Sequence, residues 1–125
     1  MIEKFKLSER AKTQLITLKR KTKIENWNIL CRWAFCLSLK EPSIPPHESI
    51  PSDSSVEMTW KVFGGEHWEV YHALLLQRCK QDGIELQPEN INAHFRLHLH
   101  RGISYLASDK SIKNISSFLG KAWPE

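Results

Sequence analysis

A helix that is apolar on nearly every side is the feature that most restricts the fold of this chain. Within residues 26–39, only Asn28 and Arg32 form a narrow polar edge. A helix of this kind has to be covered on all sides. Such cover is difficult to build within 125 residues, so the pattern predicts an oligomer assembled through this helix. The expected interface residues, from this helix and from the N-terminus, are Trp27, Leu30, Trp33, Leu37, Phe5 and Leu7.

A short strand is predicted at residues 2–7, where Phe5 and Leu7 fall on one face and Lys4 and Lys6 on the other. This alternation is typical of a half-buried strand. An isolated strand leaves its backbone groups unpaired, so it needs a partner, and the same strand of another subunit is one candidate. With the two helices that follow, the N-terminal part has a ribbon-helix-helix-like pattern.

Helical periodicity accounts for most of the remaining chain. Ser8 fits an N-cap and Pro88 fits the first turn of a later helix. Gly102 lies on the apolar stripe of that later helix, where it allows another element to approach closely. We expect a single, mainly α domain over residues 1–125, a compact arrangement of about five helices with a short N-terminal β-strand. The predicted helices cover residues 8–21, 26–39, 66–81 (with Gly83 as its stop) and 88–107, with a last short helix after Ser108.

Residues 41–55 contain four of the six prolines, together with several serines and a histidine. This composition is typical of a loop. Fifteen residues is long for a connection in a compact domain, so we expect a surface loop or a partner-facing arm. A second short strand is expected at residues 56–63, before Gly64 and Gly65.

Positive charge is concentrated at the N-terminus. Residues 1–23 hold eight Lys and Arg side chains against two acidic ones, a local charge of +6, whereas the whole chain carries +4. This asymmetry is typical of a polyanion-binding protein, although a solvated lysine-rich helix gives the same pattern. Strand lysines suit phosphates better than base edges, so we expect contacts to the DNA backbone with little sequence specificity. The amide end of the first helix, near Ser8, is a further candidate phosphate site. The candidate DNA contacts are Lys4, Lys6, Arg10, Lys12, Lys19, Arg20, Lys21 and Lys23.

No pattern in the sequence predicts a catalytic or metal site. His94 and His98 have a spacing that can hold a metal, but both flank an apolar stripe, where hydrogen-bonded histidines are the commoner explanation. Cys31 and Cys36 lie five apart in the apolar helix, so we expect inert buried thiols. The carboxylates are scattered, without a pair that divides acid and base roles. We therefore expect no enzyme activity, no metal and no cofactor.

The sequence contains no run of 18 apolar residues, so a transmembrane helix and a membrane partner are not expected. Residues 1–6 do not have the pattern of a signal peptide. Three cysteines do not make a disulfide framework. We expect a cytoplasmic protein.

Four stretches of the sequence form a recognisable set. They are residues 5–15 (beginning Phe-Lys-Leu-Ser-Glu-Arg-Ala), 26–35 (Asn-Trp-Asn-Ile-Leu-Cys-Arg-Trp-Ala-Phe), 59–66 (Thr-Trp-Lys-Val-Phe-Gly-Gly-Glu) and 98–106 (His-Leu-His-Arg-Gly-Ile-Ser-Tyr-Leu). The Trp33-Ala34-Phe35 and Phe63-Gly64-Gly65-Glu66 elements are fairly specific, since neither is a common motif. These stretches resemble the DndE family of DNA sulfur modification proteins, and the resemblance runs through nearly the whole chain.

The resemblance implies a role in bacterial DNA phosphorothioation, in which a non-bridging oxygen of the DNA backbone becomes sulfur. It implies a tetrameric, non-catalytic protein that prefers nicked double-stranded DNA and acts beside a cysteine desulfurase, an iron–sulfur sulfurtransferase and an ATPase. Surface lysines are implied as the contacts, without individual positions. One alternative is a protein–protein adaptor that scaffolds the modification complex through the Pro-rich loop and exposed aromatics. A nicking nuclease is a weaker alternative, because the carboxylates do not cluster.

Overall fold

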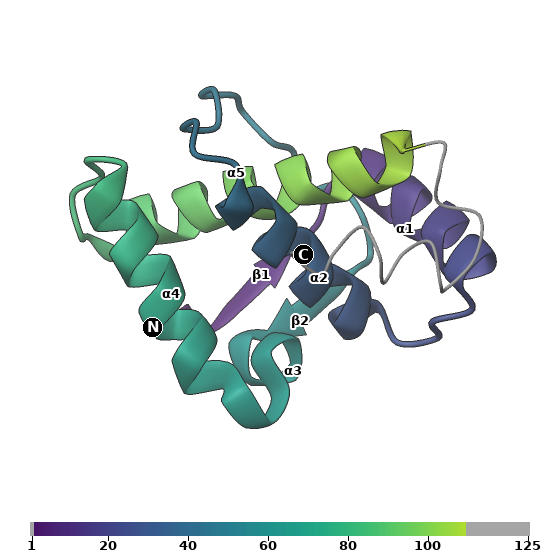
Figure 1. Cartoon of the computed structure of the whole chain (residues 1–125). Helices are drawn as coiled ribbons and strands as arrows, with labels where there is room; N and C mark the ends of the chain where they lie inside the picture. Colours follow the sequence, from purple (N-terminus) through teal and green to yellow (C-terminus); the bar gives the residue numbers. More distant parts are fainter. Residues whose placement is uncertain (1, 110–125) are drawn as a thin grey trace.

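Helices make up most of the molecule (Figure 1). The computed structural model describes residues 2–109, so the short helix expected after Ser108 lies outside the described part. The mainly α class predicted from the sequence is confirmed, and none of the described helices is long and apolar enough to cross a membrane. In chain order the elements are β1 (Lys4–Lys6), α1 (Glu9–Thr22), α2 (Trp27–Lys40), β2 (Glu57–Thr59), α3 (Trp60–Gly64), the 3₁₀ turn η1 (Gly65–His67), α4 (Trp68–Gln81) and α5 (Pro88–Ser108).

The helix ends follow local sequence features. Ser8 caps α1, because its Oγ accepts the backbone N–H of Ala11 at 3.1 Å. Pro88 occupies the first turn of α5, where its missing N–H is harmless. Gly83 follows the end of α4 with a φ of 74°, a left-handed conformation that glycine adopts without strain. These three predictions are confirmed.

The N-terminal strand finds its partner inside the chain. β1 pairs antiparallel with β2, and Phe5 lies opposite Met58. Pairing with a second subunit, as in a ribbon-helix-helix dimer, is therefore not what the structure shows. Phe5 and Leu7 are 4% and 0% exposed and point into the chain's own core, so their assignment to an oligomer interface is wrong. β2 is shorter than expected because α3 begins at Trp60.

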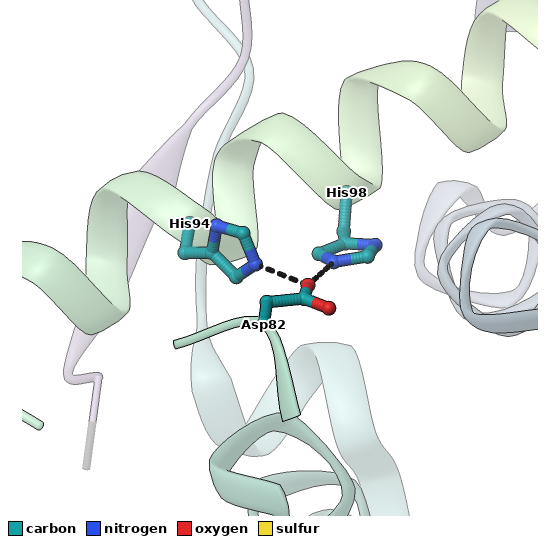
Figure 2. Close-up of side chains that lie close together, drawn as sticks. All are labelled: Asp82, His94 and His98. Carbon is teal, nitrogen blue, oxygen red and sulfur yellow. Dashed lines mark hydrogen bonds and ion pairs between the residues drawn. The ribbon is translucent and has the colours of Figure 1, made fainter. Parts of the chain in front are cut away.

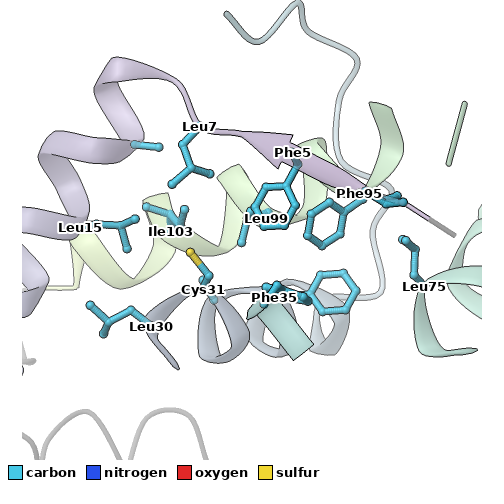
Figure 3. Close-up of a cluster of buried hydrophobic side chains, with 14 of the residues drawn as sticks. Phe5, Leu7, Leu15, Leu30, Cys31, Phe35, Leu75, Phe95, Leu99 and Ile103 are labelled. Atoms are coloured by element: carbon cyan, nitrogen blue, oxygen red, sulfur yellow. The ribbon is translucent and has the colours of Figure 1, made fainter. Parts of the chain in front are cut away.

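The core forms around α5, which crosses the molecule and packs against α1, α2 and α4 (Figure 1). Phe95 of α5 lies at its centre, with ring centroids 4.9 Å from Phe5, 5.3 Å from Phe35 and 4.9 Å from Trp60 (Figure 3). Edge-to-face aromatic pairs stabilise a core by about 0.5–1.5 kcal/mol each beyond their buried area. The aromatic cluster therefore joins β1, α2, α3 and α5 into one unit.

The apolar helix α2 is covered largely by the chain itself. It packs against α5, α3 and α1. Leu30 is 0% exposed, so its assignment to an oligomer interface is also wrong. Trp27, Trp33 and Leu37 are half-buried and remain predicted interface residues. The side of α2 toward α5 buries Leu30, Cys31, Ala34, Phe35 and Ser38.

Three arginines hold the Pro-rich loop, residues 41–55, against the helices. Arg78 of α4 and Arg96 and Arg101 of α5 donate hydrogen bonds to backbone carbonyls in or beside the loop. Arg78 is buried and the other two are half-buried. Together these guanidinium groups satisfy carbonyls of a segment that has no regular structure and tie it to its neighbours. The accepting carbonyls are Leu39, Glu41 and Ser43 for Arg78, Lys6, Ile50 and Pro51 for Arg96, and Ser38 and Ser43 for Arg101.

Candidate nucleic-acid interface

The N-terminal end of α1 is closed by groups of the same chain. Asp53, in the loop, accepts the backbone N–H of Glu9 through its Oδ1 at 2.8 Å, and Ser8 Oγ accepts the N–H of Ala11 in the same turn. A carboxylate therefore lies where a phosphate would bind the positive end of the helix dipole. The prediction of a phosphate site at this helix end is wrong, because a residue 44 positions away in the sequence fills it.

The C-terminal end of α1 carries a dense group of cations, Lys19, Arg20, Lys21 and Lys23, which we call the α1 basic end. Successive helix residues are about 100° apart around the axis. Arg20 therefore lies opposite the buried face of α1, and Lys19 and Lys21 lie on its two flanks. Three cations thus spread over the solvent side of a single helical turn. The buried face consists of Ala11, Leu15, Leu18 and Thr22.

The structure does not bring all eight predicted DNA contacts together. Lys4 and Lys6 lie on β1, and Arg10 and Lys12 lie in the first turn of α1. A helix rises about 1.5 Å per residue, so this first turn is about 15 Å from the α1 basic end. Lys4 is also paired with Glu57, with 3.3 Å between Nζ and Oε1. The four cations at the C-terminal end of α1 are therefore the densest part of the predicted interface.

Cations at a helix C-terminus also have a structural role, because they stabilise the helix dipole by about 0.3–1 kcal/mol each. Lys19 further pairs with Glu25, with 3.6 Å between Nζ and Oε2. Lys23 ends the helix with a φ of 64°, and its N–H bonds the carbonyl of Lys19. Within the described part of the chain, the side chains of Arg20 and Lys21 have no hydrogen-bond or ion-pair partner, so they are free to meet an external anion.

A second polar cluster is buried where α4 meets α5 (Figure 2). The Asp82 side chain is 2% exposed, and its Oδ2 lies 2.7 Å from Nε2 of His94 and 3.2 Å from Nε2 of His98. Arg78 donates from Nε to both carboxylate oxygens, at 2.9 and 3.0 Å. We call these four residues the Asp82 junction. The prediction that the two histidines are hydrogen-bonded at the core is confirmed.

Two members of the junction, Arg78 and Asp82, were not foreseen from the sequence. Their i, i+4 spacing at the end of α4, directly before Gly83, is the local feature that points to an Arg–Asp pair. Spacing alone does not show that the pair is buried. That follows only from the packing of α4 against α5.

Asp82, His94 and His98 are the described residues that could hold a metal ion, since their ligand atoms lie within 4.8 Å of one another. Two observations favour hydrogen bonding instead. The 2.7 Å between His94 and Asp82 is a normal N–H···O distance, and Arg78 already holds a permanent positive charge against the same carboxylate. A single set of protons satisfies the cluster: both histidines donate from Nε2, and Nδ1 of His98 accepts from Ser38 Oγ at 2.8 Å. We therefore assign the junction a structural role that links α2, α4 and α5.

Burial lowers the pKa values of two histidines on α5, His98 and His100. It lowers the pKa of His98 to about 4, although the hydrogen bond to Asp82 acts in the opposite direction. Burial likewise lowers the pKa of His100, to about 4. The Asp82 pKa is raised by burial but lowered more by hydrogen bonds from His94, His98 and Arg78, so it lies below its usual value. At neutral pH the Asp82 carboxylate is therefore anionic, paired with Arg78, and His98 is a neutral imidazole.

These shifts predict that the folded state weakens as the pH falls from about 6.5 to about 4. In that window the unfolded chain protonates His98 and His100 before the folded protein does, so proton uptake favours unfolding. A shift of one pKa unit corresponds to about 1.36 kcal/mol. The fully buried His98 alone should therefore lower the free energy of unfolding by on the order of 3 kcal/mol across this window. Urea denaturation at pH 7.5, 5.5 and 4.5 measures this loss. A free energy of unfolding that stays constant across the three values would contradict it.

Burial raises the pKa of each of the three cysteine thiols. Burial raises the pKa of Cys31 to about 12 and that of Cys79 to about 11. A thiol with so high a pKa carries almost no thiolate at neutral pH. Cys31 is buried as expected, while Cys36 is only half-buried.

Comparisons with known proteins identify relatives of this chain. The family described as DNA sulphur modification protein DndE matches residues 4–114. The crystal structure of DndE from Escherichia coli B7A, involved in DNA phosphorothioation modification, is 24% identical with a TM-score of 0.72, covering 85% of this chain and 98% of that one. A DndE mutant involved in DNA phosphorothioation is also 24% identical, with a TM-score of 0.69 and coverage of 85% and 99%. At this identity, the two structures show a shared fold. No curated protein matches the chain.

Proposed function

This chain belongs to the DndE family, which is involved in DNA phosphorothioation, and we propose that it binds nicked double-stranded DNA as a non-catalytic homotetramer. In this proposal the protein holds the DNA substrate in the cytoplasm for the other phosphorothioation proteins. In the proposal it contacts the phosphate backbone, and those partners carry out the chemistry of sulfur insertion.

The α1 basic end is the observation that carries this proposal. Four cations lie within one turn and the cap of a single helix, and Arg20 faces solvent directly opposite the buried side. Lysines and arginines arranged in this way neutralise phosphates and release the counterions condensed on DNA. They do not read base edges, so the expected binding has little sequence preference.

Assembly strengthens such a contact. In a tetramer, several weak basic ends act on one duplex at high effective concentration, so the combined affinity exceeds that of a single copy. The half-buried Trp27, Trp33 and Leu37 on α2 are the proposed contacts between subunits. Sedimentation equilibrium of the purified protein tests the oligomeric state independently of DNA.

Charge reversal at the basic end tests the DNA contact. The triple variant Lys19→Glu, Arg20→Glu, Lys21→Glu is expected to lower affinity for a nicked duplex at least about 100-fold. The slope of log affinity against log salt should become shallower by about 0.9 for each phosphate that the variant no longer neutralises. Fluorescence anisotropy across a salt series measures both quantities. Unchanged affinity would show that DNA binds elsewhere.

A second triple variant controls for net charge. Lys40, Lys61 and Lys80 are exposed and lie outside α1. Their reversal to Glu alters the net charge by the same amount, so it should weaken DNA binding only slightly. Equal losses in the two triple variants would indicate a diffuse electrostatic effect and not a binding site at the basic end.

A protein–protein adaptor is the second candidate function. Val62, Val70 and Leu74 on α3 and α4 are exposed apolar side chains, at 52%, 55% and 38%. Figure 1 shows α4 at the opposite end of the molecule from α1. An adaptor of this kind would bind intact and nicked duplexes weakly and with little dependence on salt. The same salt series therefore distinguishes the two functions.

A further inference from the structure

An open groove lies beside the first turn of α1, between this helix, the Pro-rich loop and α5. It consists of two adjoining hollows of about 230 and 190 Å³. We call it the Arg10 groove. The residues that line both hollows are Arg10, Glu48, Ile50, His100 and Ser104.

The loop wall of this groove is fixed from both sides. Arg96 of α5 donates to the carbonyls of Ile50 and Pro51, at 3.0 and 2.9 Å. Asp53 bonds the first amide of α1, and Ser54 Oγ donates to the carbonyl of Leu7 at 2.7 Å. A site held in this way needs little reorganisation on binding, which lowers the entropic cost of a ligand.

The groove combines apolar walls with polar groups that the chain does not use. Ile50 and several prolines of the loop form one wall, and Leu97 of α5 another. In the part of the chain that the structure describes, no side-chain hydrogen bond or ion pair involves Arg10, Gln14, Glu48 or Ser104. These four side chains supply a cation, an amide, a carboxylate and a hydroxyl.

This combination restricts the class of ligand. Glu48 and Asp53 would repel a simple anion in the groove, and an apolar ligand would leave the polar groups without partners. A planar heterocycle with both donors and acceptors fits better, because Gln and Glu pair with the edges of nucleobases. Arg10 adds a cation for one phosphate. Each hollow is smaller than the about 300–1,000 Å³ of drug-sized ligand pockets, so we take the occupant to be a small unit such as one nucleotide.

We infer that the Arg10 groove binds a single unstacked nucleotide at the end of an interrupted DNA strand. This inference rests on the proposed function, because α1 carries both the groove and the basic end that is proposed to hold the backbone. A base inside an intact duplex is stacked on both sides and paired. A terminal nucleotide at an interruption needs less energy to leave the stack. Occupation of the groove would thus favour nicked over intact DNA.

Filling the groove tests this inference. Ser104→Trp places a bulky side chain in both hollows without changing charge, and Ala93→Trp makes the same change at an exposed position of α5. Deoxynucleoside 5′-monophosphates, inorganic phosphate, and intact and nicked duplexes are titrated into each protein. The wild type and Ala93→Trp should bind at least one mononucleotide at least about tenfold more tightly than phosphate and should prefer the nicked duplex. Ser104→Trp should lose mononucleotide binding and nick preference while keeping intact-duplex affinity within about twofold.

A milder variant covers the case in which Ser104→Trp does not fold. Gln14→Leu removes the amide at nearly constant size and should weaken mononucleotide binding at least about fivefold. Wild-type protein that binds no mononucleotide, or binds phosphate equally well, overturns the groove inference even if DNA binding stands. Mononucleotide binding without affinity for either duplex supports the groove and refutes the proposed DNA-binding function.

Discussion

Gly102→Ala is expected to destabilise the folded protein by about 4 kcal/mol or more, at the upper end of the range for point substitutions. Gly102 lies where α5 crosses α2, and a Cβ at this position would overlap the carbonyl group of Ala34. The obstacle is helix backbone and cannot rotate away as a side chain does. Overpacking against side chains typically costs about 1–3 kcal/mol, and here two helices would have to separate along the main interface of the core. Thermal and urea denaturation followed by circular dichroism measure the loss, with an expected fall in Tm on the order of 15 °C.

Two glycine-related variants separate this steric effect from the general effects of glycine. Gly83 has a φ of 74°, and a Cβ at this position would lie in open space. Gly83→Ala should therefore lower the free energy of unfolding by only about 1 kcal/mol. Ala93→Gly, at an exposed position of α5, should cost a similar amount through helix propensity. A Tm for Gly102→Ala within a few degrees of either variant would mean that α2 and α5 do not approach as closely as the structure shows.

Local features of the fold were predictable from the sequence because they depend on neighbouring residues. Ser8 caps the helix that follows it, Pro88 opens α5, and Gly102 sits on an apolar stripe that predicts close approach. The partner of β1 was not predictable, because β2 lies some fifty residues away and strand pairing is set by packing. The expected pairing between subunits was wrong for this reason.

The apolar character of α2 shows a related limit. The sequence predicts that the residues of α2 are buried, but it does not predict whether another helix of the same chain or a second subunit covers them. α5 approaches along Gly102 and covers the side that contains Leu30 and Phe35, so part of the expected oligomer interface became core. The half-buried Trp27, Trp33 and Leu37 remain the proposed contacts with a second subunit.

The sequence predicts that the N-terminal region is positively charged, but it does not predict which of the cations lie together on one surface. Eight cations were expected to act together, but helix geometry gathers only those near Arg20 into one group. Asp53 closes the other end of α1 through a hydrogen bond between distant segments, which charge counting cannot detect. Three arginines outside the N-terminal region illustrate the same point, since Arg78, Arg96 and Arg101 bond carbonyls in or beside the loop, which a count of charges does not predict.

Asp82→Asn is expected to cost about 3–5 kcal/mol, the usual range when one partner of a buried ion pair is removed. The substitution keeps the shape of the side chain but leaves the guanidinium of Arg78, 5% exposed, without a counter-charge. It also replaces an acceptor for His94 and His98 with a group that has only one acceptor oxygen. Arg78 also donates to carbonyls at the start of the Pro-rich loop, so the substitution should destabilise the loop as well. Urea denaturation gives the free energy, and hydrogen exchange of the loop amides reports its opening.

Glu57→Gln is the matched control, because it neutralises a carboxylate whose pair with Lys4 is largely exposed, at 44% and 65%. Exposed pairs contribute about 0–1 kcal/mol, so this variant should be nearly neutral. A double-mutant cycle with Arg78→Met then isolates the charge effect. If the cost of Asp82→Asn arises from an unpaired buried cation, the double variant should be clearly more stable than the sum of the two single losses predicts. Additive losses would instead show that the stabilisation comes from packing around the histidines. A loss below about 1 kcal/mol for Asp82→Asn alone would show that the junction does not hold α4 against α5.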